Sequence, residues 1–202
     1  MDDVKAANSD APIQDVIGRR WSPYAFSDRS VSTADLHSLF EAARWTASSY
    51  NEQPWSYIVA TRDDDEGFNR LLSCLVEGNQ LWAKRAPVLA LGCASLHLKQ
   101  TGKPNAAALH DLGAASATLT FEATSRGLYV HQMIGIVPDR ARELYRIPEV
   151  VQPLTGLAIG YVLDPGSLPE KLQERDSAPR TRKKAAQFVF SGSWGSAADV
   201  VR

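Results

Sequence analysis

Ser48-Ser49-Tyr50-Asn51-Glu52-Gln53-Pro54-Trp55 is the stretch that decides how the rest of this sequence is interpreted. It gathers hydroxyls, two amides and a Pro-Trp pair between a segment with helical periodicity and one rich in β-branched and aromatic residues. Such a density of hydrogen-bonding groups between two elements favours a ligand-binding loop. The alternative is an ordinary polar connection with a proline turn, since many loops have this composition. The ordered string is nevertheless more specific than loop composition requires.

The segments on either side of this loop predict a helix and a strand. Ser32 is a suitable N-cap, with Asp35 three residues later, as in a weak capping box. The helix that follows has an apolar face formed by Leu36, Leu39, Phe40 and Ala43. After the loop, residues 55–61 alternate and are rich in Tyr, Ile and Val, which predicts a strand.

Further along the chain, helices and strands are predicted to alternate. Residues 65–84 have helical periodicity with a break near Gly78, and residues 87–94 form an apolar run typical of a buried strand. The longest predicted helix spans about 105–126 and ends at Gly127, which suits the left-handed position after a helix. A short helix near residues 11–20 and strands at 127–131 and 154–162 complete the pattern.

From Asp164 onward the chain changes character. Prolines and many charges predict an extended arm with one short helix, and Gln187-Phe188-Val189-Phe190 is a strand candidate that would pair with its own sheet or a neighbour's. The pattern predicts one domain over residues 1–202, with a core at about 13–163 and a C-terminal arm at about 164–202. We expect an α+β fold with a central mixed β-sheet flanked by helices.

Composition and motifs exclude several classes of protein. The formal charge of -1 gives no reason to expect nucleic acid or an anionic membrane as a partner. Cys74 and Cys93 lie in apolar surroundings without CxxC spacing, so they are predicted core residues and not metal ligands or a disulfide. The polar, acidic N-terminus and the lack of a long apolar segment predict a cytoplasmic protein. No motif supports a Rossmann or P-loop fold.

Two groups of basic residues are candidates for binding an anion. Arg19-Arg20-Trp21-Ser22 follows the first predicted helix, and Arg180 and Arg182 flank one threonine in an extended segment, where both can point the same way. Guanidinium groups hold phosphate through paired hydrogen bonds without a metal. Each group alone is better explained as a solvated surface, since surface arginine is common, and only together with the loop at residues 48–55 do they indicate a phosphate-bearing ligand.

No residue has the setting of a nucleophile or general acid. The four histidines, His110 among them, have no carboxylate or cysteine at catalytic spacing, and no metal-binding motif occurs. Gly127–Gly135 is too apolar for a surface loop, and its backbone N–H groups suit close approach to a ring, although alone it is typical of a core strand. If the chain is an enzyme, a cofactor must carry its reaction.

Three separated segments, in order over about residues 13–195, resemble the nitroreductase-like family of FMN-dependent oxidoreductases. The early Arg-x-Ser-x-x-x-Phe motif corresponds to residues 20–26, and the loop that usually serves the partner subunit's FMN corresponds to residues 47–55. The resemblance assigns FMN binding to Arg19, Arg20, Trp21, Ser22, Tyr24, Ala47, Ser48, Ser49, Asn51, Asn79, Gln132, Met133, Ile134, Gly135, Arg180 and Arg182. It assigns no catalytic residue and no metal.

The resemblance implies a homodimer with one FMN in each interfacial site and a C-terminal strand exchanged between subunits. It implies ping-pong hydride transfer from NAD(P)H through FMN to a small acceptor, namely a nitroaromatic, a quinone or an activated alkene. Flavin fragmentation, dehalogenation and a non-catalytic FMN-binding dimeric module remain alternatives. The sequence departs from the family pattern at Tyr24, Ala47, Trp82 and Ile134, where a cation, Pro, Lys and Glu are common.

Overall fold

A four-stranded antiparallel sheet organises the computed structural model, which describes residues 2–201. The strands are β1 (Trp55–Thr61), β2 (Val88–Ser95), β3 (Tyr129–Met133) and β4 (Val151–Gly160), in the spatial order β1-β2-β4-β3. All three pairings are antiparallel, so the prediction of a mixed sheet is wrong for the described chain. The long crossover between β2 and β3 leaves them running the same way, but β4 lies between them and separates them.

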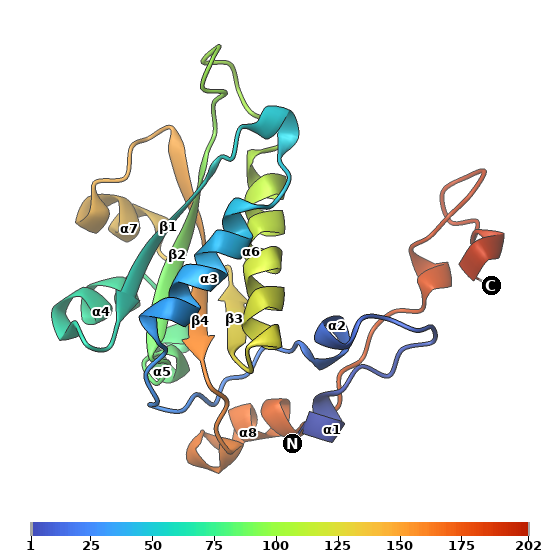
Figure 1. Cartoon of the computed structure of the whole chain (residues 1–202), viewed down its shortest axis with the longest axis horizontal. Helices are drawn as coiled ribbons and strands as arrows, with labels where there is room; N and C mark the ends of the chain where they lie inside the picture. Colours follow the sequence, from blue (N-terminus) through green and yellow to red (C-terminus); the bar gives the residue numbers. More distant parts are fainter. Residues whose placement is uncertain (1, 202) are drawn as a thin grey trace.

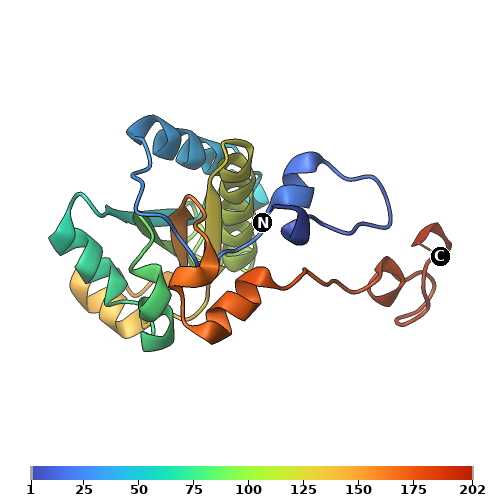
Figure 2. The same cartoon turned by 90° about the horizontal axis from the view of Figure 1, so that it is seen from below.

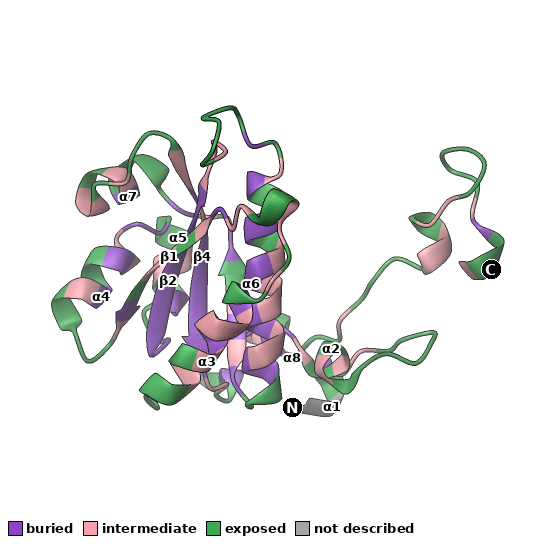
Figure 3. Cartoon of the chain, turned by 45° about the horizontal axis from the view of Figure 1, so that its top comes forward, coloured by how far each residue is buried: buried purple, intermediate pink, exposed green. Residues whose placement is uncertain are grey.

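Helices cover both faces of this sheet (Figure 1). One face carries α3 (Thr33–Arg44) and α6 (Ala108–Ser125), and the other carries α4 (Asp65–Leu72), α5 (Glu77–Ala83) and α7 (Pro138–Tyr145). Val88 and Ala90 of β2 pack in the cluster under α3 and α6, whereas Leu89 and Leu91 pack in the cluster under α4, α5 and α7. Burial on both faces explains why the predicted strand at 87–94 is a continuous apolar run (Figure 3).

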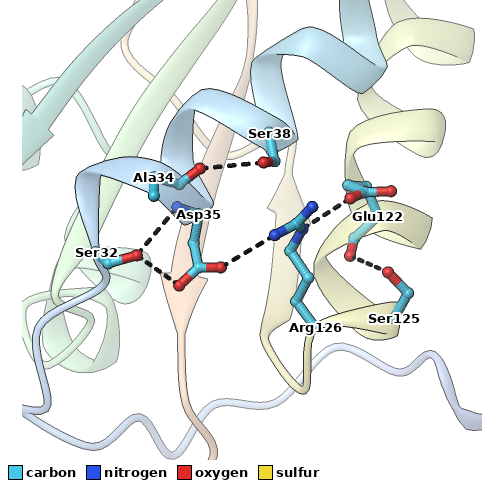
Figure 4. A network of polar contacts seen from close by, with 7 residues as sticks. All are labelled: Ser32, Ala34, Asp35, Ser38, Glu122, Ser125 and Arg126. Atoms are coloured by element: carbon cyan, nitrogen blue, oxygen red, sulfur yellow. Dashed lines mark hydrogen bonds and ion pairs between the residues drawn. The ribbon is translucent and has the colours of Figure 1, made fainter.

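The two helices on the first face are tied together at their ends (Figure 4). Asp35 N donates to Ser32 Oγ at 3.0 Å, which confirms the predicted N-cap of α3. Arg126, just after α6, donates to Glu122 Oε1 at 2.7 Å and to Asp35 Oδ1 at 3.3 Å. The chain then turns at Gly127, whose φ of 72° confirms the predicted left-handed position.

Several element boundaries differ from those predicted. The first helical segment is short, because α2 covers only Asp15–Arg19, and the break near Gly78 falls earlier, so that Gly78 lies inside α5. Helix α7 was not predicted. The strand expected at 187–190 is wrong within this chain, since Ala185–Gln187 forms a 3-10 turn (η3) and Phe190 makes a single bridge to Ala197. No strand of the described chain lies alongside this segment to pair with it.

Both ends of the chain lie outside the layered body. Helix α1 (Asp2–Lys5) and α2 form an N-terminal hairpin, and α8 (Glu170–Ser177) lies close to α1 (Figure 1). Beyond α8 the chain extends away from the sheet, with Trp194 94% exposed (Figure 2). The remaining short turns are η1 (Ser49–Asn51), η2 (Pro165–Ser167) and η4 (Asp199–Val201). None of the described helices is both long enough and apolar enough to cross a membrane.

Candidate functional site

Three guanidinium groups from distant parts of the sequence meet at one cavity. Arg20, Arg180 and Arg182 line a space of about 610 Å³ between the N-terminal hairpin, the end of α6 and the C-terminal arm. Arg180 donates through Nη1 and Nη2 to the carbonyl oxygens of Arg20 and Gly18. Arg20 Nη1 donates to Ser22 Oγ at 3.3 Å. These contacts give the guanidinium cluster (Arg20, Arg180 and Arg182) a defined arrangement.

The electrostatics of the guanidinium cluster favour an anion. Burial lowers the pKa of Arg20, and the positive charges of Arg180 and Arg182 lower it further. Burial and Arg182 likewise lower the pKa of Arg180, whose Nε is buried without a hydrogen-bond partner. Within residues 2–201 no carboxylate forms an ion pair with any of the three. A phosphate dianion would compensate this charge and could accept from the unpaired donor.

Arg19, just before the early motif, and the other large side chains within it point elsewhere. Arg19 turns outward to an ion pair with Asp15 at 2.6 Å. Trp21 is buried against the ring of Tyr129, with 5.7 Å between ring centroids. The Tyr24 ring packs edge-on against Trp82, and its hydroxyl accepts from Arg175 Nη1 at 3.1 Å. Arg20 and Ser22 are therefore the two motif side chains that the structure joins at the guanidinium cluster.

Trp82 and His131 form an aromatic layer behind this motif. Trp82 is fully buried, stacks on Phe26 and lies 4.4 Å from His131 between ring centroids. His131 Nδ1 lies 2.8 Å from the carbonyl oxygen of Pro23, and burial lowers the pKa of this imidazole. Trp82 thus belongs to the core, although some members of the resembled family have a cation there.

Two predicted site residues that are distant in sequence are in direct contact. Asn79 Nδ2 donates to the carbonyl oxygen of Gly135 at 3.0 Å, and Val76 N donates to the same oxygen at 3.0 Å. A Cβ atom on Gly135 would overlap the Asn79 amide and lie 2.9 Å from Val76 Cγ2. Glycine is therefore required for this approach.

Residues 132–134 line a smaller cavity of about 260 Å³ beside the first half of α6. The Gln132 amide donates to Ser116 O at 3.0 Å and to Thr120 Oγ1 at 2.8 Å, so its side chain is committed to the helix. Met133 is buried, whereas Ile134 is 70% exposed. The end of β3 thus offers an apolar surface next to the Asn79–Gly135 contact.

The amide loop (Ser48–Trp55) lies at a third place, at the start of α6. Ala47, Ser48 and Ser49 line a cavity of about 560 Å³ together with Ala106, Ala107, His110 and Asp111. Tyr50, Asn51 and Gln53 have φ values of 52°, 55° and 48°, a left-handed conformation that costs free energy for residues other than glycine. The side chain of Gln53 donates to the backbone and side-chain oxygens of Asn51, each at 3.0 Å.

A buried carboxylate that sequence analysis did not identify holds this loop. Asp111 is 2% exposed, and its Oδ2 accepts from Ser49 N at 3.0 Å. Its Oδ1 lies 3.0 Å from Nδ1 of His110, the adjacent residue, a contact that the prediction about catalytic spacing did not cover. Adjacent residues of a helix seldom face one another. Asp111 lies in the first turn of α6, but the helix was predicted to begin at about residue 105, so no signal in the sequence indicated this role.

Comparison with known proteins identifies the family. The sequence model of the nitroreductase family matches residues 17–78, which contain the early motif and the amide loop. A crystal structure of an FMN-containing oxidoreductase has a TM-score of 0.88, at 35% identity, and the match covers 93% of this chain and 95% of that one. The chain belongs to the nitroreductase family.

Two further relatives of this nitroreductase-family chain are an uncharacterised protein and an FMN reductase. A 15.4 kDa protein from Mycolicibacterium smegmatis, itself uncharacterised, is 39% identical over 132 residues, which are 65% of this chain and 87% of that protein. The FMN reductase (NAD(P)H) of Bacillus subtilis is 30% identical over 161 residues, which are 69% of this chain and 61% of that protein. The four-stranded sheet with its flanking helices is therefore the fold of an oxidoreductase family.

In this member of the nitroreductase family, three groups of predicted site residues lie at different places along α6. The amide loop lies at the beginning of the helix, residues 132–134 lie beside its first half, and the guanidinium cluster lies near Phe121. Asp111 and Phe121 are ten residues apart, which is about 15 Å along a helix. Within one chain the amide loop therefore does not line the guanidinium cavity.

Proposed function

We propose that this protein is an FMN-dependent NAD(P)H oxidoreductase. The observation that carries the proposal is the guanidinium cluster, in which three like charges converge without an anionic partner and leave a buried Arg180 Nε unpaired. A terminal phosphate fits these donors in charge and geometry. The names of the similar FMN-containing oxidoreductase and FMN reductase support the same cofactor.

The remaining predicted residues fit the other parts of the cofactor. Arg20, Arg180 and Arg182 would hold the phosphate, while Asn79 and the main chain up to Gly135 would lie against the ring. When bound, FMN supplies two-electron transfer between NAD(P)H and an acceptor. The protein orients the ring and places hydrogen-bond donors where negative charge develops. The exposed Ile134 and the small cavity beside it suit a flat, apolar acceptor such as a nitroaromatic, a quinone or an activated alkene.

We further propose a homodimer in which the amide loop of one subunit serves the FMN of the other. The distance between this loop and the guanidinium cluster along α6 supports that arrangement, because one chain brings only part of the predicted residues together. Exposed apolar side chains in the C-terminal arm, Phe188 and Trp194, are consistent with cover by a second copy. A strand exchanged through residues 187–190 would supply that cover.

A flavin titration followed by anaerobic reduction tests the proposed function. We expect full-length protein to bind one FMN per chain, with the visible spectrum of a bound flavin, and NAD(P)H to bleach that spectrum before any acceptor is added. Protein that binds no FMN, or binds it but is not bleached by NADH or NADPH, would contradict the proposal. Dissociation of the dimer by dilution should release FMN if the amide loop reaches the neighbouring site.

A further inference from the structure

Two buried charges lie outside the cavity yet hold the segments that form it. Lys5 is 5% exposed and Asp176 is 2% exposed. Burying a charge is costly unless hydrogen bonds compensate it, so both side chains need an explanation. Burial lowers the pKa of Lys5 and raises that of Asp176, while the attraction between the two opposes both shifts.

Lys5 secures the end of α8. Its Nζ donates to the carbonyl oxygens of Arg175 at 2.7 Å and Ala178 at 2.6 Å, groups that a helix leaves without partners at its C-terminus. The same ammonium lies 4.9 Å from the centre of the Trp21 ring. Figure 1 shows α1 beside the point where the chain leaves α8. Arg180 follows two residues after Ala178, so Lys5 fixes the start of the segment that carries it.

Asp176 secures the early motif to the same helix. Its Oδ2 accepts from Tyr24 N and Ala25 N, each at 2.9 Å, and its Oδ1 accepts from Tyr24 N at 3.1 Å. These N–H groups lie a few residues after Arg20 and Ser22. The N-terminal helix, the early motif and the arm are therefore joined through two buried side chains.

The contacts of Lys5 and Asp176 hold the guanidinium cluster together against its mutual repulsion, to which the charge of Lys5 itself adds. Like charges at close range favour separation, and contacts of Arg180 with the Arg20 and Gly18 carbonyls restrain the cluster from within. Lys5 and Asp176 restrain the segments that carry it through contacts outside the cavity, which neither residue lines. We propose that Lys5 and Asp176 are positioning residues that hold the guanidinium cluster in the arrangement that recognises a flavin phosphate. They would thereby set the preference for FMN over riboflavin, an inference that rests on the proposed function.

The experiment compares two flavins that differ only in the phosphate. Flavin-stripped full-length protein is titrated with FMN and with riboflavin, and Kd is read from the quenching of flavin fluorescence. For Lys5→Met and Asp176→Asn we expect the FMN Kd to rise about tenfold or more, with less than about threefold change for riboflavin. Lys5→Arg, which keeps the charge, should restore most of the preference.

Matched controls come from the same helix. Lys171→Met and Glu174→Gln remove exposed charges of α8 by the same chemical changes, and both should leave the two dissociation constants unchanged. Circular dichroism melting verifies that each variant is folded. If Lys5→Met does not fold, the dissociation constants of Asp176→Asn for FMN and riboflavin still test the proposal.

The outcomes separate this proposal from the proposed function. If the wild-type protein binds FMN no more tightly than riboflavin, both proposals fail. If it prefers FMN and the two variants keep that preference, or lose affinity for both flavins equally, only the positioning role is overturned. A selective loss of FMN affinity supports it.

Discussion

The guanidinium cluster and the amide loop belong to one proposed binding site, yet they are built in opposite ways. Arg20 and Arg180 contact each other across 160 residues of sequence, and buried charges from two further segments stand behind them. The loop takes much of its shape from residues within five positions of one another, while Asp111 and the Lys99 N–H add long-range bonds to Ser49 and Glu52. The proposed phosphate site therefore depends on tertiary structure, whereas much of the loop conformation is set by local contacts.

The largest expected effect breaks the cluster directly. Arg20→Ala combined with Arg182→Ala removes two charge-assisted partners of the phosphate, so the FMN Kd should rise about 10²- to 10⁴-fold. Fluorescence titration measures this change, and riboflavin serves as the control because it has no phosphate. An unchanged FMN affinity would show that the guanidinium cluster does not bind the flavin phosphate.

The next prediction concerns the Asn79–Gly135 contact, which lies outside both regions. Gly135→Ala forces a Cβ into Asn79 and Val76, so the free energy of unfolding should fall by about 1–3 kcal/mol. Gly113→Ala is the matched control, since its Cβ meets open space on α6 and alanine favours helix by about 0.5–1 kcal/mol. Urea unfolding of both variants gives the two values. Equal effects of the two substitutions would mean that the close approach at Gly135 does not matter.

A third variant asks whether the amide loop is separate from phosphate recognition. Asp111→Ala leaves Ser49 N without its acceptor, and we expect about 1–3 kcal/mol less stability. Hydrogen exchange at Ser49 should accelerate, and the affinities for FMN and riboflavin should change in parallel. A selective loss of FMN affinity in this variant would show that the loop also positions the phosphate, so that the guanidinium cluster and the amide loop would share one role.

The smallest expected effect concerns pH. Burial lowers the pKa of His131 from its ordinary value of 6.5, so the folded state favours the neutral imidazole. The unfolded state then binds the proton first, and this stability is present above pH 6.5 and lost as pH falls toward the folded pKa. Urea unfolding at several pH values should show this slope, and His131→Asn should remove it. Because the charged imidazole would be buried against the Tyr24 and Trp82 rings, acid should loosen the early motif before the amide loop, although the Pro23 carbonyl itself favours the protonated form.

Local signals predicted the local structure well. Strand β1 has the predicted bounds 55–61, and the Ser32 cap and the turn at Gly127 are confirmed, because capping and alternation depend on neighbouring residues. The buried strand at 87–94 followed from its apolar run. The predicted helical piece of the arm corresponds to α8.

Long-range features were not predictable in the same way. The spatial order of the strands depends on β4 lying between β2 and β3, and the hydrophobic periodicity of a strand does not indicate its neighbours. Lys5 and Asp176 each look like an ordinary charged residue in sequence, since their burial and their backbone partners arise from segments more than 150 positions away. For the site itself, the structure joins Arg20 to Arg180 and Asn79 to Gly135, while the family resemblance was needed to connect them to a flavin.

The left-handed residues of the amide loop have a consequence for any attempt to improve this protein. Tyr50, Asn51 and Gln53 keep a left-handed backbone conformation, which costs about 1–2 kcal/mol for Tyr50 and Gln53 and less for Asn51, because asparagine tolerates it. Where this cost exceeds the roughly 0.5–1 kcal/mol that glycine loses in conformational entropy, selection for stability alone would favour glycine at these positions. The same replacements would remove the amides that the loop presents. In this region, durability and cofactor chemistry demand different amino acids.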